Sequence, residues 1–197
     1  LNSSLSGMNL RVGPSQLSIQ LKNLTKGGTI PIGNAKAITK VLDKNSNWKA
    51  KIIGDEKREK INLTHKNADL LGFKKHDDVI KIFKKSSIAV VCSRWEEPFG
   101  RTSLEASANG CAVIITNKGG LPETITDAKI LESLSVEKLK KTLNLLIKNS
   151  SERKRLQKLS ILNFYLTHEF VTKKIDTYRN EKLQSINKFN ILKKKTK

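Results

Sequence analysis

The sequence predicts an α/β protein built on an open parallel sheet, and three observations support this fold class. Residues 88–92 and 112–116 are short continuous apolar runs, as expected for parallel strands that are buried on both faces. Amphipathic stretches of about ten residues separate the strands along the chain. Loops containing Gly and Pro follow several strands. This alternation predicts right-handed βαβ units in a Rossmann-like open parallel sheet with helices on both faces.

Each element follows from its local pattern. The expected strands are residues 17–21, 48–53, 68–73, 88–92 and 112–116. Helices are expected at 34–44, at 56–66, at 79–85 and after the loop 93–100 as far as residue 108. Asn34 and Asp77 are placed to cap two of these helices. The apolar faces of the same two helices consist of Ala37, Ile38, Val41 and Leu42 in one and Val79, Ile80 and Phe83 in the other.

The chain divides into three expected segments. Residues 1–16 lack periodicity and contain Gly7, Gly13 and Pro14, so they are interpreted as a linker or leader. Residues 17–167 form the Rossmann-like domain, although from residue 136 to about 191 the pattern is helical and rich in Lys. Residues 168–197 form a C-terminal helix with a basic tail. Because the first residue is Leu1, we expect the sequence to be a piece of a longer protein.

The formal net charge of +20 suggests partners that carry phosphate, such as nucleic acid, anionic lipid or a diphosphate. A nucleic-acid surface would cluster its cations and use Arg for bidentate phosphate contacts, whereas here the cations are mostly dispersed Lys. Nucleic acid is therefore not the expected partner. The Lys-rich tail at 193–197 predicts either a solvated terminus or peripheral contact with an anionic membrane.

Cysteine and histidine usage is consistent with a cytoplasmic protein without a metal centre. Cys92 and Cys111 do not make a disulfide framework, which favours a reducing compartment. No apolar stretch approaches the roughly 18 residues of a membrane span, and the N-terminus lacks a leader pattern. We therefore expect a cytoplasmic location, or a peripheral one at the inner face of the membrane. His65, His76 and His168 are scattered, so no metal is expected.

The loop that follows the strand at 88–92 has the features of an anion site. Gly100 lies where the loop turns into a helix, and the N–H groups of Gly100, Arg101 and Thr102 would bind an anion with the helix dipole. Glu105, one turn later, could accept hydrogen bonds from the hydroxyls of a ribose, and Glu97 could do so for a sugar ring. Each feature alone also has a structural explanation, because surface Glu pairs are common. The ordered combination after a buried strand favours a binding site.

The segment from Glu97 to Glu105, two glutamates separated by seven residues, resembles the signature of group 1 (family 4) retaining glycosyltransferases of GT-B fold. The similarity covers most of the chain. The further matching motifs are Gly54-Asp55, Leu71-Gly72-Phe73, Gly110-Cys111-Ala112-Val113-Ile114 and Gly119-Gly120-Leu121-Pro122-Glu123. Their order and spacing imply the C-terminal, donor-binding half of such an enzyme.

The resemblance implies roles for individual residues. Glu97 would hold donor-sugar hydroxyls, and Lys26 would pair with the departing diphosphate, so these two are the expected catalytic residues. Glu105 would bind the ribose. The other expected donor-binding residues are Phe99, Gly100, Arg101 and Thr102 near the sugar or diphosphate, and Phe73 and Lys74 at the base. Lys22 stands near the family's usual Arg, as a point charge without the bidentate fork. No metal or other cofactor is implied.

The implied activity is retaining transfer of a hexose from a nucleoside diphosphate sugar to a glycan or lipid acceptor. The family's N-terminal Rossmann-like domain, which contributes the acceptor site, lies outside these residues, so we expect the isolated chain to bind donor and to transfer sugar poorly. One alternative is a non-catalytic GT-B-like interaction module that has lost donor binding. The other is a basic nucleic-acid-binding protein, which rests on net charge alone.

Overall fold

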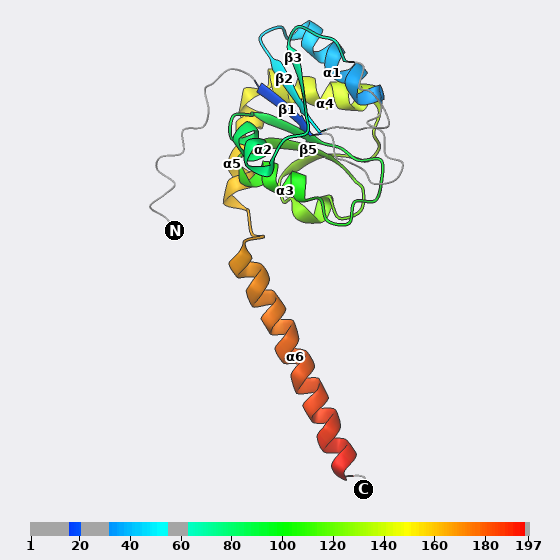
Figure 1. Ribbon diagram of the computed structural model, residues 1–197, viewed down its shortest axis with the longest axis vertical. Coiled ribbons are helices and arrows are strands. Elements are labelled where there is room, and N and C mark those ends of the chain that lie inside the picture. Colours follow the sequence, from blue (N-terminus) through cyan, green and yellow to red (C-terminus); the bar gives the residue numbers. More distant parts are fainter. Residues whose placement is uncertain (1–15, 21–31, 55–62, 196–197) are drawn as a thin grey trace, which may run out of the picture. The chain divides into compact units, whose positions relative to one another are not determined.

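A computed structural model of the chain describes residues 16–20, 32–54 and 63–195, and these contain one parallel sheet (Figure 1). The strand order is β3-β2-β1-β4-β5-β6, and all five strand pairings are parallel. The strands are β1 (Gln16–Gln20), β2 (Lys49–Ile53), β3 (Ala68–Gly72), β4 (Ile88–Val91), β5 (Ala112–Thr116) and β6 (Ala128–Leu131). The strand order reverses direction between β1 and β4, which is the point where ligands bind in open α/β sheets. The predicted fold class is confirmed.

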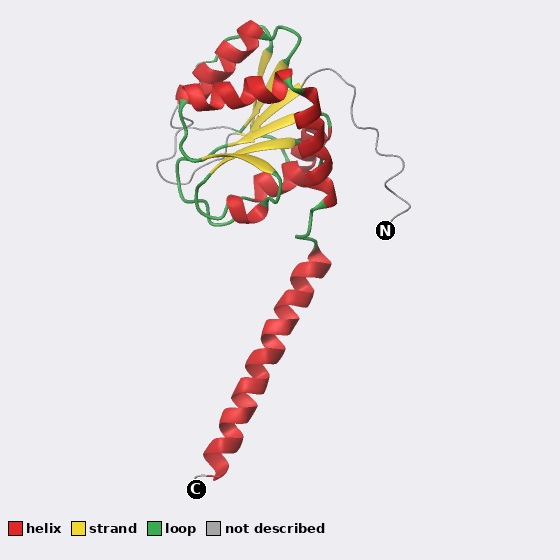
Figure 2. Cartoon of the chain, turned by 180° about the vertical axis from the view of Figure 1, so that it is seen from behind, coloured by secondary structure: helices red, strands yellow, loops and turns green. Residues whose placement is uncertain are grey.

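Helices lie on both faces of the sheet (Figure 2). Between the strands the chain forms α1 (Ile32–Lys44), α2 (His76–Lys84), α3 (Arg101–Ala108) and the 3-10 turn η1 (Pro122–Thr124). After β6 it forms α4 (Val136–Lys148), α5 (Ser150–Leu162) and α6 (His168–Lys195). The helix α2 begins at His76, and its N-cap residue is Lys75 rather than Asp77. Asp77 lies in the first turn instead, where a negative charge favours the helix dipole.

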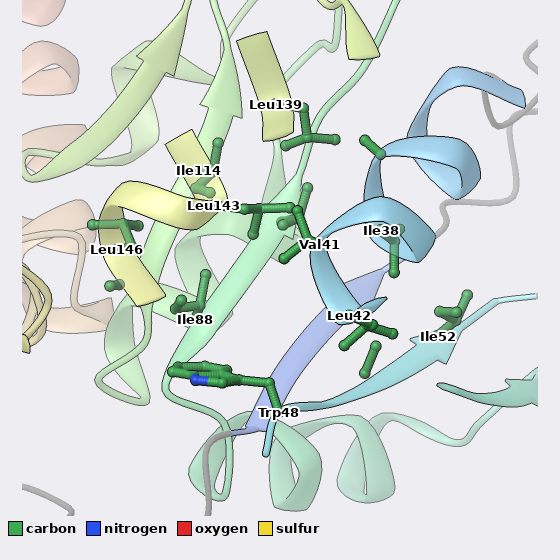
Figure 3. Packing of buried hydrophobic residues seen from close by; sticks show 14 of the residues in the cluster. Ile38, Val41, Leu42, Trp48, Ile52, Ile88, Ile114, Leu139, Leu143 and Leu146 are labelled. Atoms are coloured by element: carbon green, nitrogen blue, oxygen red, sulfur yellow. The ribbon is translucent and has the colours of Figure 1, made fainter. Parts of the chain in front are cut away.

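Alternate residues of the central strands divide the core into two layers. Ile88 and Ile114 belong to the layer under α1 and α4, whereas Ala89 and Val113 belong to the layer under α2 and α3. In the first layer, Leu139 and Leu143 of α4 and Val41 of α1 gather over the strand residues, with Trp48 at one side (Figure 3). The period of two along β4 and β5 thus buries both faces of the sheet at its centre, as the continuous apolar runs predicted.

Two segments depart from the sequence prediction. The described part of the segment expected to be helical at 56–66 is not helical, and residues 55–62 lie outside the description. There, His65 accepts a hydrogen bond through Nδ1 from the Asn67 N–H at 3.0 Å, which closes a turn ahead of β3. The sixth strand, β6, was not predicted because it has only four residues and includes Lys129. Lys129 reaches Glu152 of α5 at 2.6 Å, so its charge is neutralised at the edge of the sheet.

The helical pattern from residue 136 is confirmed, but the structure divides it into three helices. Side-chain caps mark two of the starts: Ser135 Oγ accepts the Lys138 N–H at 3.1 Å, and Asn149 Oδ1 accepts the Glu152 N–H at 2.9 Å. The chain separates into two compact units between Phe164 and Tyr165. Within the described residues, the structure contains no helix that is both long and apolar enough to cross a membrane.

The buried face of α4 allows a direct test of the first core layer. Leu143 is completely buried, whereas Leu145 of the same helix is 45% exposed. We expect Leu143→Ala to lower the free energy of unfolding by about 2–5 kcal/mol, because it leaves a cavity. Leu145→Ala, the control, should change it by no more than about 0.5 kcal/mol. Urea denaturation monitored by circular dichroism measures both values, and equal losses would contradict this assignment of the core.

Candidate functional site

Two loops at the carboxyl ends of β4 and β5 form the candidate site. Residues 92–100 connect β4 to α3, and residues 117–121 connect β5 to η1. Because β4 and β5 are adjacent parallel strands, both loops leave the sheet at the same edge. This is the edge at which ligands bind in open α/β sheets.

Hydrogen bonds fasten the loop after β4 to the end of β5 and to the loop that follows it. Thr116 Oγ1 accepts the Ser93 N–H at 2.9 Å and donates to the Ser93 carbonyl at 2.7 Å. Further out, the Gly120 N–H donates to the Glu97 carbonyl at 2.6 Å. The backbone around Glu97 is therefore held by the loop that follows β5.

Glu96 adds a charged contact to the same junction. Its Oε1 pairs with Lys118 Nζ at 2.9 Å, and its Oε2 accepts the Gly119 N–H at 2.5 Å. The Lys118 hydrogen bond, followed by that of the Gly119 N–H, lowers the pKa of the Glu96 carboxyl below its usual value. Glu96 thus binds the β5 loop by both oxygens, although no local pattern distinguishes it from the neighbouring Glu97.

Two glycines allow the close approach of the loops. A Cβ atom on Gly119 would lie 2.3 Å from the Glu97 carbonyl oxygen, and one on Gly120 would lie 2.7 Å from the Pro98 carbonyl oxygen. Gly119 also has a φ of 51°, in the left-handed region. Any larger residue at either position would push the two loops apart.

The turn into α3 places the first N–H groups of the helix beside the loop that precedes it. Gly100 has a φ of 80°, and a Cβ there would lie 2.7 Å from Leu121 Cδ2. The Gly100 carbonyl accepts the Ser103 N–H at 3.1 Å and the Ser103 hydroxyl at 2.6 Å. Among the residues that the structure describes, the N–H groups of Arg101 and Thr102 have no acceptor, as is usual for the first turn of a helix. An anion could bind them.

The two glutamates of the motif have different surroundings. Glu97 is only 6% exposed, because its loop is folded against residues 117–120. The sequence predicted a carboxylate open to a ligand, so this burial is a difference. Glu105 lies one turn into α3 with its side chain 21% exposed. Its Oε1 is 3.5 Å from Arg101 Nη2 and 3.7 Å from His76 Nδ1.

His76 links the connection after β3 to this site. It is the first residue of α2, which packs beside α3. In the sequence it was only one of three scattered histidines, because its contact with Glu105 is made between two helices and leaves no local pattern. Lys74 and Phe73 lie two and three residues before it at the end of β3, and Phe73 is 69% exposed.

The remaining predicted residues fall into three groups. Arg101 and Phe99 are exposed at the site, whereas the Thr102 side chain is buried and leaves only its backbone for a ligand. Lys22 and Lys26 lie outside the described residues.

Within the described residues, no group of three or more His, Cys, Asp or Glu side chains could hold a metal ion.

Both cysteines are free thiols. Burial raises the pKa of the Cys92 thiol to about 12, so it remains protonated at neutral pH. The buried Cys111 thiol lies 3.4 Å from the Phe83 carbonyl oxygen. Neither thiol is therefore suited to act as a nucleophile at this site.

The sheet topology and the glycine-rich junction at its carboxyl edge define the class of the protein, a Rossmann-like domain of the kind found in GT-B glycosyltransferases. A match to a protein family makes this classification more specific. Residues 33–161 match the family described as Glycosyl transferases group 1. The chain belongs to this family, and the predicted resemblance is confirmed at that level.

Curated relatives match over part of their length. Spore coat protein SA of Bacillus subtilis is 34% identical over 92 residues, covering 45% of this chain and 24% of that protein. An uncharacterized glycosyltransferase of Methanocaldococcus jannaschii, MJ1178, is 36% identical over 124 residues, covering 51% of this chain and 34% of that protein. The chain thus spans about a quarter to a third of these relatives.

Solved structures share the fold. Anabaena Alr3699/HepE in complex with UDP and glucose superposes with a TM-score of 0.65 at 18% identity, covering 87% of this chain and 49% of that chain. The C-terminal domain of the group 1 glycosyl transferase LpcC from Francisella tularensis has a TM-score of 0.60 at 25% identity. Here the coverage is 83% of this chain and 87% of that chain.

The approach of Gly119 to the Glu97 loop predicts a specific cost of substitution. We expect Gly119→Ala to destabilise the protein by about 1–2 kcal/mol for its left-handed φ and by about 1–3 kcal/mol more for the clash. Gly72→Ala is the matched control, since Gly72 has a φ of 60° and no atom within 4 Å of an added Cβ. Thermal denaturation compares the two variants. If they lose equal stability, the clash with the loop is refuted.

The lowered pKa of Glu96 predicts a pH-dependent contribution to stability. Because the folded-state pKa lies below the unfolded value, the stabilisation is present above the usual carboxyl pKa of 4.5 and is lost as the pH falls through the folded value. We therefore expect wild type to exceed Glu96→Gln in stability at pH 7, with a smaller difference at pH 4. Urea denaturation at both pH values measures this. A difference that stays constant or grows on acidification would contradict the ion pair.

Proposed function

We propose that this domain binds the nucleoside diphosphate sugar donor of a retaining glycosyltransferase. The observation that carries the proposal is the start of α3. There the N–H groups of Arg101 and Thr102 have no acceptor in the part of the chain that the structure describes, an acidic side chain follows one turn later, and hydrogen bonds fix the neighbouring loop. A diphosphate is an anion that suits the first turn of a helix. A ribose offers adjacent hydroxyls that suit a carboxylate such as Glu105.

Each part of the donor has a corresponding group in this proposal. The diphosphate binds the N–H groups of Arg101 and Thr102, with Gly100 allowing close approach. Glu105 accepts hydrogen bonds from the ribose. Glu97 binds hydroxyls of the sugar, which requires its buried carboxylate to face the donor when the donor is bound.

The base and the charges of the diphosphate use the outer part of the site. The exposed ring of Phe73 and the backbone of Lys74 border the nucleobase, and Phe99 borders the sugar. Lys22 and Lys26, which lie outside the described residues, supply cationic charge to the diphosphate as in the resemblance. Helix dipole and lysine charge then replace a metal ion at the leaving group.

The reaction of the whole protein is transfer of a hexosyl group with retention at its anomeric carbon. The bond from that carbon to the β-phosphate oxygen breaks, and the nucleoside diphosphate departs with the bonding pair. A hydroxyl oxygen of a glycan or lipid acceptor bonds to the same face of the carbon, and the hydroxyl proton is released. A second Rossmann-like domain supplies the acceptor site, and the Lys-rich tail at 193–197 is a candidate contact with an anionic membrane on its cytoplasmic side.

Titration calorimetry of the chain at low salt with UDP, GDP and ADP tests donor binding. We expect at least one of them to bind, and Glu105→Ala to weaken that binding by about 1–3 kcal/mol, the scale for lost hydrogen bonds to a charged group. Glu137→Ala is the matched control. Glu137 is an exposed acid that pairs with Lys140 of the same helix, α4, which covers the opposite face of the sheet from α3. Absence of binding by all three nucleotides, or equal effects of the two variants, would overturn the proposal.

A further inference from the structure

The carboxylate of Glu105 is held from one side only. Arg101 Nη2 and His76 Nδ1 both contact Oε1, at 3.5 Å and 3.7 Å. Oε2 has no hydrogen-bond partner among the residues that the structure describes. One oxygen is therefore engaged by two basic groups, and the other remains available to a ligand.

His76 reaches this position because α2 is anchored against the sheet. Val79 and Phe83 are buried in the layer under α2 and α3, which fixes the first turn of α2 beside α3. The acidic Asp78 on the same helix is paired with Lys81 at 3.1 Å. His76 itself contacts a carboxylate of the neighbouring helix α3, that of Glu105.

Stability does not explain this contact. The His76 side chain is 58% exposed, and at such an exposed position even a charged pair would contribute little to folding. The contact matters more for ligand binding than for folding, because a carboxylate that is already fixed in one conformation loses less side-chain entropy when it binds a ligand. A ligand would also exclude water from the neighbouring Arg101–Glu105 ion pair and strengthen its attraction.

We propose that His76 is a positioning residue for the donor: with Arg101 it holds Oε1 of Glu105 so that Oε2 accepts hydrogen bonds from the ribose hydroxyls. This inference rests on the proposed function. It assigns a role in nucleotide recognition to a residue outside the signature motif. It also connects α2 with α3 in forming the ribose site.

A double-mutant cycle tests the proposal on the full chain. The binding of UDP, or of whichever of UDP, GDP and ADP binds wild type most tightly, is measured by calorimetry for His76→Ala, Glu105→Gln and the double variant. We expect His76→Ala to weaken binding about three- to tenfold, the scale of coupling within one contacting pair, and to have almost no effect in the Glu105→Gln background. Lys81→Ala, on the exposed side of α2, is the control and should leave binding unchanged.

A second ligand separates positioning from direct contact. With the 2′,3′-dideoxy form of the same nucleotide, which lacks the ribose hydroxyls, His76→Ala should lose its effect. An effect that persists in the Glu105→Gln background or with the dideoxy nucleotide would show that His76 contacts the base or phosphate itself, and would overturn the proposal. So would nucleotide binding that falls in Glu105→Gln but not in His76→Ala. Failure of wild type to bind any nucleotide would instead refute the proposed function on which the inference rests.

Discussion

The hydrogen bond from the Gly120 N–H to the Glu97 carbonyl is the contact on which the candidate site depends. It joins the loops after β4 and β5, and it forms only because positions 119 and 120 lack side chains that would strike the opposite backbone. Once the loops are joined, the turn at Gly100 and the start of α3 have a fixed position relative to the sheet. The glycines of the β5 loop therefore determine the geometry of the junction rather than offering side chains to a ligand.

The sequence was sufficient to predict the layers of strands and helices, but it was not sufficient to predict the contacts between these elements. Strands such as 88–92 and 112–116 were predictable because burial on both faces requires an unbroken apolar run. The four-residue β6 was missed, since its Lys129 is made compatible with the sheet edge by Glu152, a residue distant in sequence. The segment expected to be helical at 56–66 failed in its described part because His65 bonds locally to Asn67 and starts a turn.

The same division applies to the candidate site. The motif from Glu97 to Glu105 was recognisable because its residues lie on one loop and one helix, in fixed order. Glu96 and His76 were not singled out, since their partners Lys118 and Glu105 lie on other elements. Local sequence patterns report on a residue's own element, so contacts made across two loops or two helices require the folded chain.

The large positive charge acquires a different meaning from these contacts. Several acidic side chains are already paired within one helix, as Asp78 is with Lys81 and Glu169 with Lys173, and such exposed pairs contribute little to stability. At the candidate site, by contrast, Lys118 is paired with Glu96 and Arg101 with Glu105, which joins side chains of the site to one another. Each of these two cations is engaged by a carboxylate and orients it, so its charge is not simply available to an anion. The net charge of +20 consequently says less about the ligand than the placement of these few pairs, because the placement decides which oxygens remain available for hydrogen bonding.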